Sequence, residues 1–202
     1  MDRPPYSTAW LARWRQEIGD VVGAMLLTFE ETHGFAPGDN RVRVADEDDR
    51  RAARDVAREP LASGDLLTFY ESVGEVALPD VGNGYFVHPA RELLRRLSEE
   101  GAVFVPEADD PHGVVIGSDG GGGLFVADRG GAVHRTRTAS PGGSEFDRVA
   151  DDLQEFLELL RAAVVRFAET GEPCLSPGTP GAELRGVRDT GSPPSSAPRP
   201  DG

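Results

Sequence analysis

The sequence predicts an α+β protein in which an antiparallel β-sheet of about five to six strands is flanked by helices. Three observations lead to this fold class. Apolar residues recur at spacings of three and four near both ends of residues 1–170, which indicates a long N-terminal and a long C-terminal helix. Short runs rich in β-branched and aromatic residues lie between them. The runs between residues 113 and 138 have links too short for parallel crossovers, so they form a central antiparallel meander.

The first helix is expected to begin after Ser7, a good N-cap residue, and to run to about His33, where Gly34 would cap it. Trp10 and Trp14 fall on its apolar face, one turn apart. These two indoles could form a platform for a ligand, but packing in the core is the favoured interpretation.

A brief strand over residues 41–44 and a charged helix over residues 46–59 are expected next. Four acidic residues, Asp46 to Asp49, open this helix and suit the positive end of its dipole. They could also hold a cation, but the segment lacks the glycine and the distal glutamate of a calcium loop. We therefore predict no metal and no cofactor for this chain.

Residues 65–89 carry the densest set of local signals. Apolar residues between Leu66 and Val73 predict a short helix, and Gly74 is placed to end it in a left-handed conformation. Residues 75–78 alternate like a half-buried strand, residues 79–84 form a turn, and residues 85–87 resume a strand.

The remaining elements follow from the same signals. A helix over residues 90–100 ends at Gly101, and a strand over residues 102–105 precedes an acidic loop. Three strand candidates cover residues 113–118, 124–128 and 132–138, and a long helix is expected from about Asp147 to Thr170. Residues 1–170 are thus predicted to form a single domain. Residues 171–202, rich in proline, glycine and serine, are predicted to be a disordered tail.

The net charge of the chain limits the classes of partner that we expect. The formal net charge is −14, and all 21 basic residues are arginine. Such an acidic surface repels nucleic acids and anionic membranes, so neither is predicted as a partner. It favours a basic protein partner, or it serves only solubility. Cys174 is the sole cysteine, and neither a signal peptide nor a membrane span is recognisable, so we expect a cytoplasmic protein.

The sequence motifs indicate no catalytic site. The glycine run Gly120–Gly123 could cradle a phosphate, but a strand follows it and the chain has no lysine, which favours a hairpin turn. No GxSxG elbow is present, and Cys174 lies in the predicted tail. The histidines lack metal-ligand spacing, although they could converge in space. They are His33, His88, His112 and His134.

The order of these elements resembles the SUKH superfamily, the Smi/Knr-like proteins. The resemblance rests on the helix Leu66-Leu67-Thr68-Phe69-Tyr70, on Gly74 and on the Asn83-Gly84 turn. Residues 116–128 resemble the family's central hairpin, in which a glycine turn leads into an aromatic strand ending in aspartate. The final helix resembles the family's closing helix through Ala150, Leu153, Phe156, Leu157 and Leu160.

The resemblance implies a compact α+β domain without a common set of catalytic residues. Most bacterial members look like immunity proteins that neutralise a cognate toxin, often a nuclease, and others act as regulatory scaffolds. We therefore predict a non-enzymatic protein-binding domain of the immunity type. The alternatives are a regulatory scaffold and an enzyme whose site is not visible in the sequence.

The partner is expected to be a basic toxin domain, because the chain is strongly acidic. The predicted contact surface lies where a helix end and a loop adjoin, and two further acidic residues lie near the turn of residues 79–84. The predicted contact residues are Glu99, Glu100, Glu107, Asp109, Asp110, Glu75 and Asp80.

Overall fold

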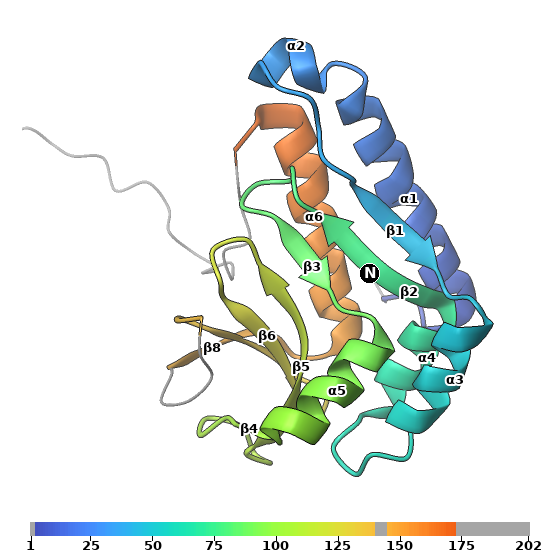
Figure 1. Cartoon of the computed structure of the whole chain (residues 1–202), viewed down its shortest axis with the longest axis vertical. Helices are drawn as coiled ribbons and strands as arrows, with labels where there is room; N and C mark the ends of the chain where they lie inside the picture. Colours follow the sequence, from blue (N-terminus) through green and yellow to red (C-terminus); the bar gives the residue numbers. More distant parts are fainter. Residues whose placement is uncertain (1–2, 140–144, 173–202) are drawn as a thin grey trace, which may run out of the picture.

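The computed structural model describes residues 3–139 and 145–172 and confirms the α+β class (Figure 1). Its helices are α1 (Thr8–Leu26), α2 (Phe29–His33), α3 (Glu47–Val56), α4 (Gly64–Ser72), α5 (Ala90–Glu100) and α6 (Leu153–Thr170). Its strands are β1 (Arg41–Val44), β2 (Val73–Leu78), β3 (Tyr85–Val87), β4 (Val103–Phe104), β5 (His112–Asp119), β6 (Leu124–Asp128), β7 (Val133–Thr136) and β8 (Phe146–Ala150). Apart from Gly171 and Glu172, the predicted tail lies outside the described residues, and so does Cys174. None of the helices described is long and apolar enough to cross a membrane.

The described strands form one antiparallel sheet. Their order is β1-β2-β3-β5-β6-β7-β8, and β4 pairs with β5 beside this path. Neighbours along the path follow one another in the chain except around β4, so the sheet is a meander from β1 at one edge to β8 at the other. The eight strands in the described residues exceed the five to six that the sequence predicts, because β8 extends the sheet and the short β1 and β4 join it.

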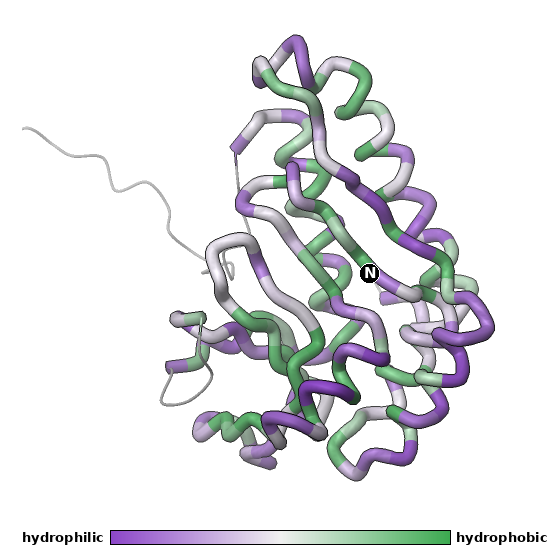
Figure 2. Tube along the Cα trace, in the orientation of Figure 1, coloured by the Kyte–Doolittle hydropathy of each residue, from purple (hydrophilic) through white to green (hydrophobic). Residues whose placement is uncertain are grey.

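The main core lies between one face of the sheet and the helices. Helices α1 and α6 pack side by side behind the sheet in Figure 1, and hydrophobic and hydrophilic residues alternate along α1 in Figure 2. Trp14 of α1 donates its indole N–H to the backbone oxygen of Leu157 in α6 at 2.7 Å. Helix α3 packs against α4 and α5 beside the end of this layer. Residues of α1, α3, α4, α5 and α6 thus share one apolar core.

A smaller apolar cluster covers the other face of the sheet around β5 and β6. Alternate residues of a strand point to opposite faces, so Phe125 joins the main core while its neighbours Leu124 and Val126 join this second cluster. The cluster consists of Val103, Val105, Val115, Leu124, Val126 and Phe146.

The first helix is shorter than predicted. It is capped by Ser7, whose hydroxyl accepts the N–H of Trp10, but it ends at Leu26, and α2 begins at Phe29. The break leaves Leu27 85% exposed and turns Phe29 inward to 3% exposure. Burial of the aromatic ring therefore outweighs the continuous helical spacing that the sequence shows.

The start of the last helix was placed too early by the sequence pattern. Residues Phe146–Ala150 form the edge strand β8 rather than the first turn of α6, which begins at Leu153 after the N-cap Asp152. Val149 and Ala150 also fit the helical stripe, so spacing alone favours the wrong element. Pairing with β7 satisfies the backbone of β8, and Phe146 completes the second apolar cluster.

Gly74 does not end a helix. Helix α4 ends at Ser72, and Gly74 lies inside β2 without a left-handed conformation. A Cβ at this position would lie 2.6 Å from Oδ2 of Asp49 and 2.7 Å from Nη2 of Arg43. A side chain here would collide with the ion pair of Asp49 and Arg43, which occupies the space above the strand, so only glycine fits.

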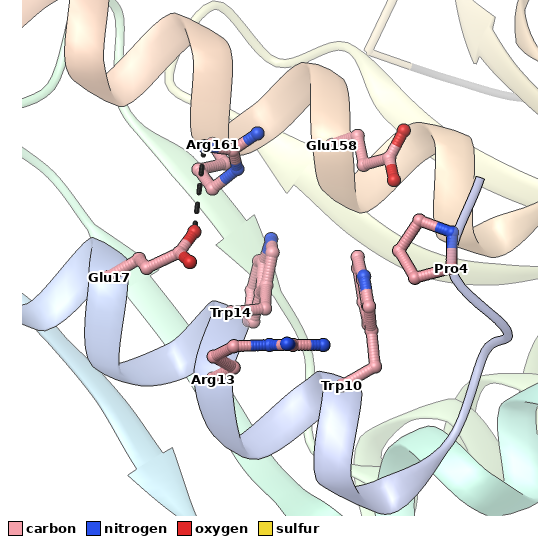
Figure 3. A pocket seen from close by; sticks show the side chains of 7 residues that line it. All are labelled: Pro4, Trp10, Arg13, Trp14, Glu17, Glu158 and Arg161. Carbon is pink, nitrogen blue, oxygen red and sulfur yellow. Dashed lines mark ion pairs between the residues drawn. The ribbon is translucent and has the colours of Figure 1, made fainter. Parts of the chain in front are cut away.

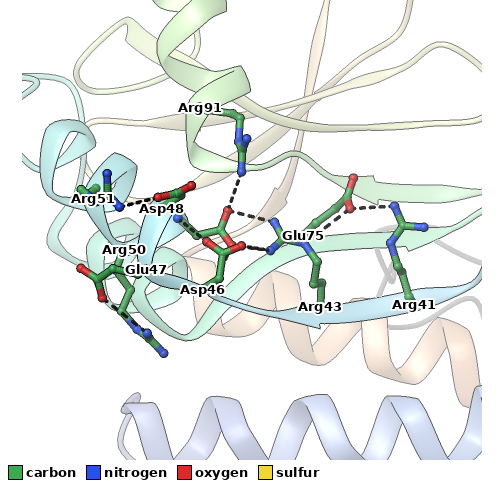
Figure 4. A network of polar contacts seen from close by, with 10 residues as sticks. Arg41, Arg43, Asp46, Glu47, Asp48, Arg50, Arg51, Glu75 and Arg91 are labelled. Atoms are coloured by element: carbon green, nitrogen blue, oxygen red, sulfur yellow. Dashed lines mark hydrogen bonds and ion pairs between the residues drawn. The ribbon is translucent and has the colours of Figure 1, made fainter.

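Asp49 is the centre of that ion pair and is only 2% exposed. Its partners Arg43, Asp46 and Arg91 are labelled in Figure 4. Its carboxylate accepts two hydrogen bonds from Arg43 of β1 and a third from Arg91 of α5, at 3.3 Å. Asp49 also accepts the N–H of Asp46 at 3.0 Å, while the side chain of Asp46 accepts the N–H of Asp49 at 2.9 Å. This capping box and the two arginines account for two of the acidic residues considered as a cation site.

The glycine run forms the turn between β5 and β6, as predicted. Oδ1 of Asp119 accepts the N–H groups of Gly121 and Gly123, both at 2.9 Å, so these donors are already used within the turn. Arg135 holds the other carboxylate oxygen. The turn also packs against the β2–β3 turn, because a Cβ on Gly120 would lie 1.7 Å from the carbonyl oxygen of Asn83.

The first prediction concerns the Asp49 ion pair. Hydrogen bonds from Arg43 hold the pKa of Asp49 well below its usual range. Because the folded-state pKa is lowered, the stabilisation is fully present above the unfolded pKa of about 3.9 and is lost as the pH falls toward the folded value. Asp49→Asn should lower the free energy of unfolding by about 3 kcal/mol at neutral pH, and by less below about pH 4. Urea unfolding across this pH range measures both effects.

Asp48→Asn is the matched control for this prediction. Asp48 lies on the same helix, but its ion pair with Arg51 is exposed, so its replacement should cost no more than about 0.5 kcal/mol. Equal losses for the two variants would show that burial of the Asp49 carboxylate has no special role.

The second prediction concerns the packed turn. Gly120→Ala should lower the free energy of unfolding by roughly 3 kcal/mol, because the methyl group would overlap the backbone of the neighbouring turn. Gly121→Ala is the control, since its Cβ would meet only the Asp119 carboxylate, at 3.2 Å. The prediction fails if thermal unfolding of Gly120→Ala matches that of Gly121→Ala.

Candidate partner-binding surface

Five of the predicted contact residues gather at one end of the molecule. Helix α5 ends at Gly101, which has a φ of 79°, and the chain enters β4 two residues later. β4 and β5 pair around the loop of residues 105–111, so the helix end and this loop adjoin (Figure 1). We call these five residues the acidic surface: Glu99, Glu100, Glu107, Asp109 and Asp110.

The helical half of the acidic surface is balanced by arginines of α5. Glu99 pairs with Arg95, and Glu100 pairs with Arg96 at 3.7 Å. Both arginines also bind Glu92, and the hydrogen bonds from Arg95 and then Arg96 lower the pKa of Glu92 to about 2. The side chains of Arg95, Glu99 and Glu100 are solvent-exposed and those of Glu92 and Arg96 are partly exposed, so each pair contributes little to stability.

The loop half carries uncompensated negative charge. Among the described residues, Glu107 and Asp109 have no ion-pair partner, and both are exposed. Asp110 differs, because its carboxylate lies 3.4 Å from Arg129 and 3.5 Å from His112. The loop can therefore attract a basic surface without first breaking an ion pair at Glu107 or Asp109.

Phe104 lies between the two halves in the chain and is 59% exposed. Its ring meets His112 of β5 edge to face, with ring centroids 6.2 Å apart. The prediction of contact residues missed Phe104, although the alternation of Val103, Phe104 and Val105 contains the signal. Both valines point into the second apolar cluster, so Phe104 must point outward.

Glu75 and Asp80 lie away from the acidic surface and bind groups of their own chain. Glu75 of β2 lies opposite Arg43 of β1, and its carboxylate is 3.0 Å from Arg41. Asp80 accepts the N–H of Gly38 at 2.6 Å and the side-chain amide of Asn40 at 2.5 Å. Glu75 thus joins β2 to β1, and Asp80 joins the turn after β2 to the loop before β1.

The four histidines lie in different surroundings. His134 is buried and lies 2.9 Å from the carboxylate of Asp128, while His88 lies 3.1 Å from the hydroxyl of Ser118. Burial, followed by the charge of Arg96, lowers the pKa of His88. His33 stacks on Phe167, and His112 contacts Phe104.

A metal site needs several histidine, cysteine, aspartate or glutamate side chains around one ion. Within residues 3–139 and 145–172, no group of three or more histidine, cysteine, aspartate or glutamate side chains could hold a metal ion. The acidic surface itself combines the exposed ring of Phe104 with the negative charges of Glu107 and Asp109.

Comparison with known proteins gives no relative. No protein-family model, no curated protein and no solved structure matches this chain. The SUKH resemblance therefore stays a prediction, and any function must be argued from the residues themselves.

Proposed function

We propose that this chain is a non-enzymatic protein-binding domain of the immunity type, which binds and neutralises a basic toxin domain. The observation that carries the proposal is the exposed Phe104 beside the acidic surface. The SUKH resemblance and the net charge of −14 support the same function.

The arrangement fits the usual energetics of protein interfaces. An aromatic ring that becomes buried at the centre of an interface can contribute about 2 kcal/mol or more to binding. Surrounding charges contribute mainly to the association rate and to the choice of partner. Phe104 would therefore supply affinity, and Glu107 and Asp109 would attract a basic partner.

A nuclease toxin is a suitable partner on physical grounds. An enzyme that binds a phosphate backbone needs a basic surface, and a carboxylate-rich protein can occupy that surface in place of the nucleic acid. Binding would block the toxin without any reaction on the immunity protein, so no catalytic group is required here.

A regulatory scaffold is the second candidate function. One observation favours it: Leu27 and Phe35 are 85% and 57% exposed near α2, at the end of the molecule opposite α5 and β4 (Figure 1). A protein with two separate apolar surfaces can hold two partners at once. This candidate predicts a ternary complex, whereas the immunity function requires only a binary one.

The third prediction tests the role of Phe104. We expect a toxin domain to be encoded beside this gene. This toxin domain should arrest growth when expressed alone, and co-expression of this chain should restore growth. Phe104→Ala should weaken binding of the purified toxin domain about 30-fold, because the aromatic anchor is lost. Phe35→Ala, which removes a similarly exposed ring at the opposite end, should change the dissociation constant less than about twofold. Equal effects of the two variants, or no protection by the unaltered chain, would contradict the proposal.

The fourth prediction tests the charges. The double variant Glu107→Arg and Asp109→Arg should lower the association rate constant with the same toxin domain about tenfold or more at low salt. Raising the salt concentration should lower the association rate constant of the unaltered chain, because ions screen the attraction. The difference in rate constant between this chain and the double variant should therefore become smaller. Stopped-flow association measures both rates. An association rate that depends on neither the charges nor the salt would exclude electrostatic steering.

A further inference from the structure

A pocket of about 320 Å³ lies between the first and the last helix, away from the acidic surface (Figure 3). This volume is within the range of small-molecule sites. Helix α1 supplies one wall, α6 supplies the facing wall, and Pro4 closes one end. The side chains of α1 and α6 that line the pocket are Trp10, Arg13, Trp14, Glu17, Glu158 and Arg161.

The walls of the pocket are fixed by contacts around it. Trp14 is held by its hydrogen bond to the carbonyl oxygen of Leu157. The buried Gln154 donates from Nε2 to the carbonyl oxygen of Pro4 at 2.9 Å, and Arg3 pairs with Asp152. The N-terminal segment is thus fastened to the first turns of α6, so a ligand would meet a preformed site.

Two tryptophans form the apolar part of the pocket. Trp10 and Trp14 belong to the core, at 7% and 2% exposure, which agrees with the interpretation favoured from the sequence. Their rings are also nearly parallel, with planes 20° apart and centroids separated by 6.5 Å, and both line the hollow. At these exposures the two side chains mainly pack the core, and a ligand in the hollow can touch only a small part of Trp10 and less of Trp14.

Four charged side chains line the pocket, and two of them form an ion pair with each other. Glu17 and Arg161 lie 3.5 Å apart and neutralise each other. Arg13 and Glu158 line the same pocket, but neither has an ion-pair partner within the described part of the chain. They lie on opposite sides of the hollow in Figure 3, one on each helix.

We propose that this pocket binds a small apolar zwitterion. The carboxylate of the ligand would face Arg13, its ammonium group would face Glu158, and its apolar part would lie against Trp10 and Trp14. A simple anion would be repelled by Glu158, and a simple cation would be repelled by Arg13, so a ligand that carries both charges is favoured. This inference does not depend on the proposed immunity function.

The matching chemistry has two sources, a free α-amino acid and a short peptide with both ends free. The test uses L-phenylalanine, L-leucine and the dipeptide phenylalanylglycine as probes. Because the chain has only two tryptophans and both line the pocket, tryptophan fluorescence reports on this site alone. Isothermal titration calorimetry on the full chain detects binding that leaves the fluorescence unchanged.

We expect saturable binding of at least one zwitterionic probe with a dissociation constant below about 1 mM. If the amino acids bind more tightly than the dipeptide, the ligand is a free amino acid, and the reverse order indicates a peptide. N-acetyl-phenylalanine and phenylalanine amide each lack one charge and should bind at least tenfold more weakly. Binding of these blocked probes that equals that of phenylalanine, or no binding of any probe, would overturn the proposal.

Paired variants separate the two charged contacts from general effects on the fold. Arg13→Gln and Glu158→Gln should each weaken the zwitterion at least tenfold, and thermal unfolding should stay near that of the unaltered chain. The controls are Arg15→Gln on α1 and Glu169→Gln on α6, neither of which lines the pocket. Unchanged binding in both test variants, or equal losses in test and control variants, would contradict the assigned contacts.

Discussion

The buried carboxylate of Asp49 is a polar contact at the place where α3, β1, β2 and α5 meet. It belongs to α3, binds Arg43 of β1 and Arg91 of α5, and lies over Gly74 of β2. A charge removed from water is tolerated only when its oxygen atoms are occupied, and here two arginines and the backbone of Asp46 occupy them. This requirement fixes the positions of four elements at once, and it explains why β2 has no side chain at residue 74.

The same ion pair also bears on the proposed interface. Arg91 lies in the first turn of α5, whose last turn carries Glu99 and Glu100 and leads into β4. Helix α5 therefore connects the buried network at one end with the acidic surface at the other. Val103 and Val105, the neighbours of Phe104 in the chain, are both buried. Phe104 therefore projects from a packed strand rather than from a free loop. Such support lowers the entropy that a binding surface must lose when it meets a partner.

Local patterns were sufficient for most elements, and they failed where contacts distant in the sequence decide the structure. The helices, the central hairpins and the glycine turn follow from spacing and turn residues. The strand β8 could not be told from a helix, because Val149 and Ala150 fit both periods and only the partner strand β7 selects one. The role of Gly74 depends on Asp49, which lies on a different element. The alternation of residues 103–105 is sufficient to predict that Phe104 points outward. By contrast, Arg13 and Glu158 come to line the same pocket only when α1 and α6 pack.

The contact between Trp14 and Leu157 has a consequence for synthesis of the protein. These residues are 143 positions apart, whereas the strands pair mainly with their neighbours in the chain. During translation the sheet can grow strand by strand, but the apolar stripe of α1 is made first and must wait for α6, which is made near the end. In a nascent chain that stops before α6, the side of α1 that packs on α6, which includes Trp14, lacks that helix. Incomplete chains thus expose apolar surface on α1, which chaperones and proteases can recognise. Once α6 is complete, its packing against α1 buries this surface.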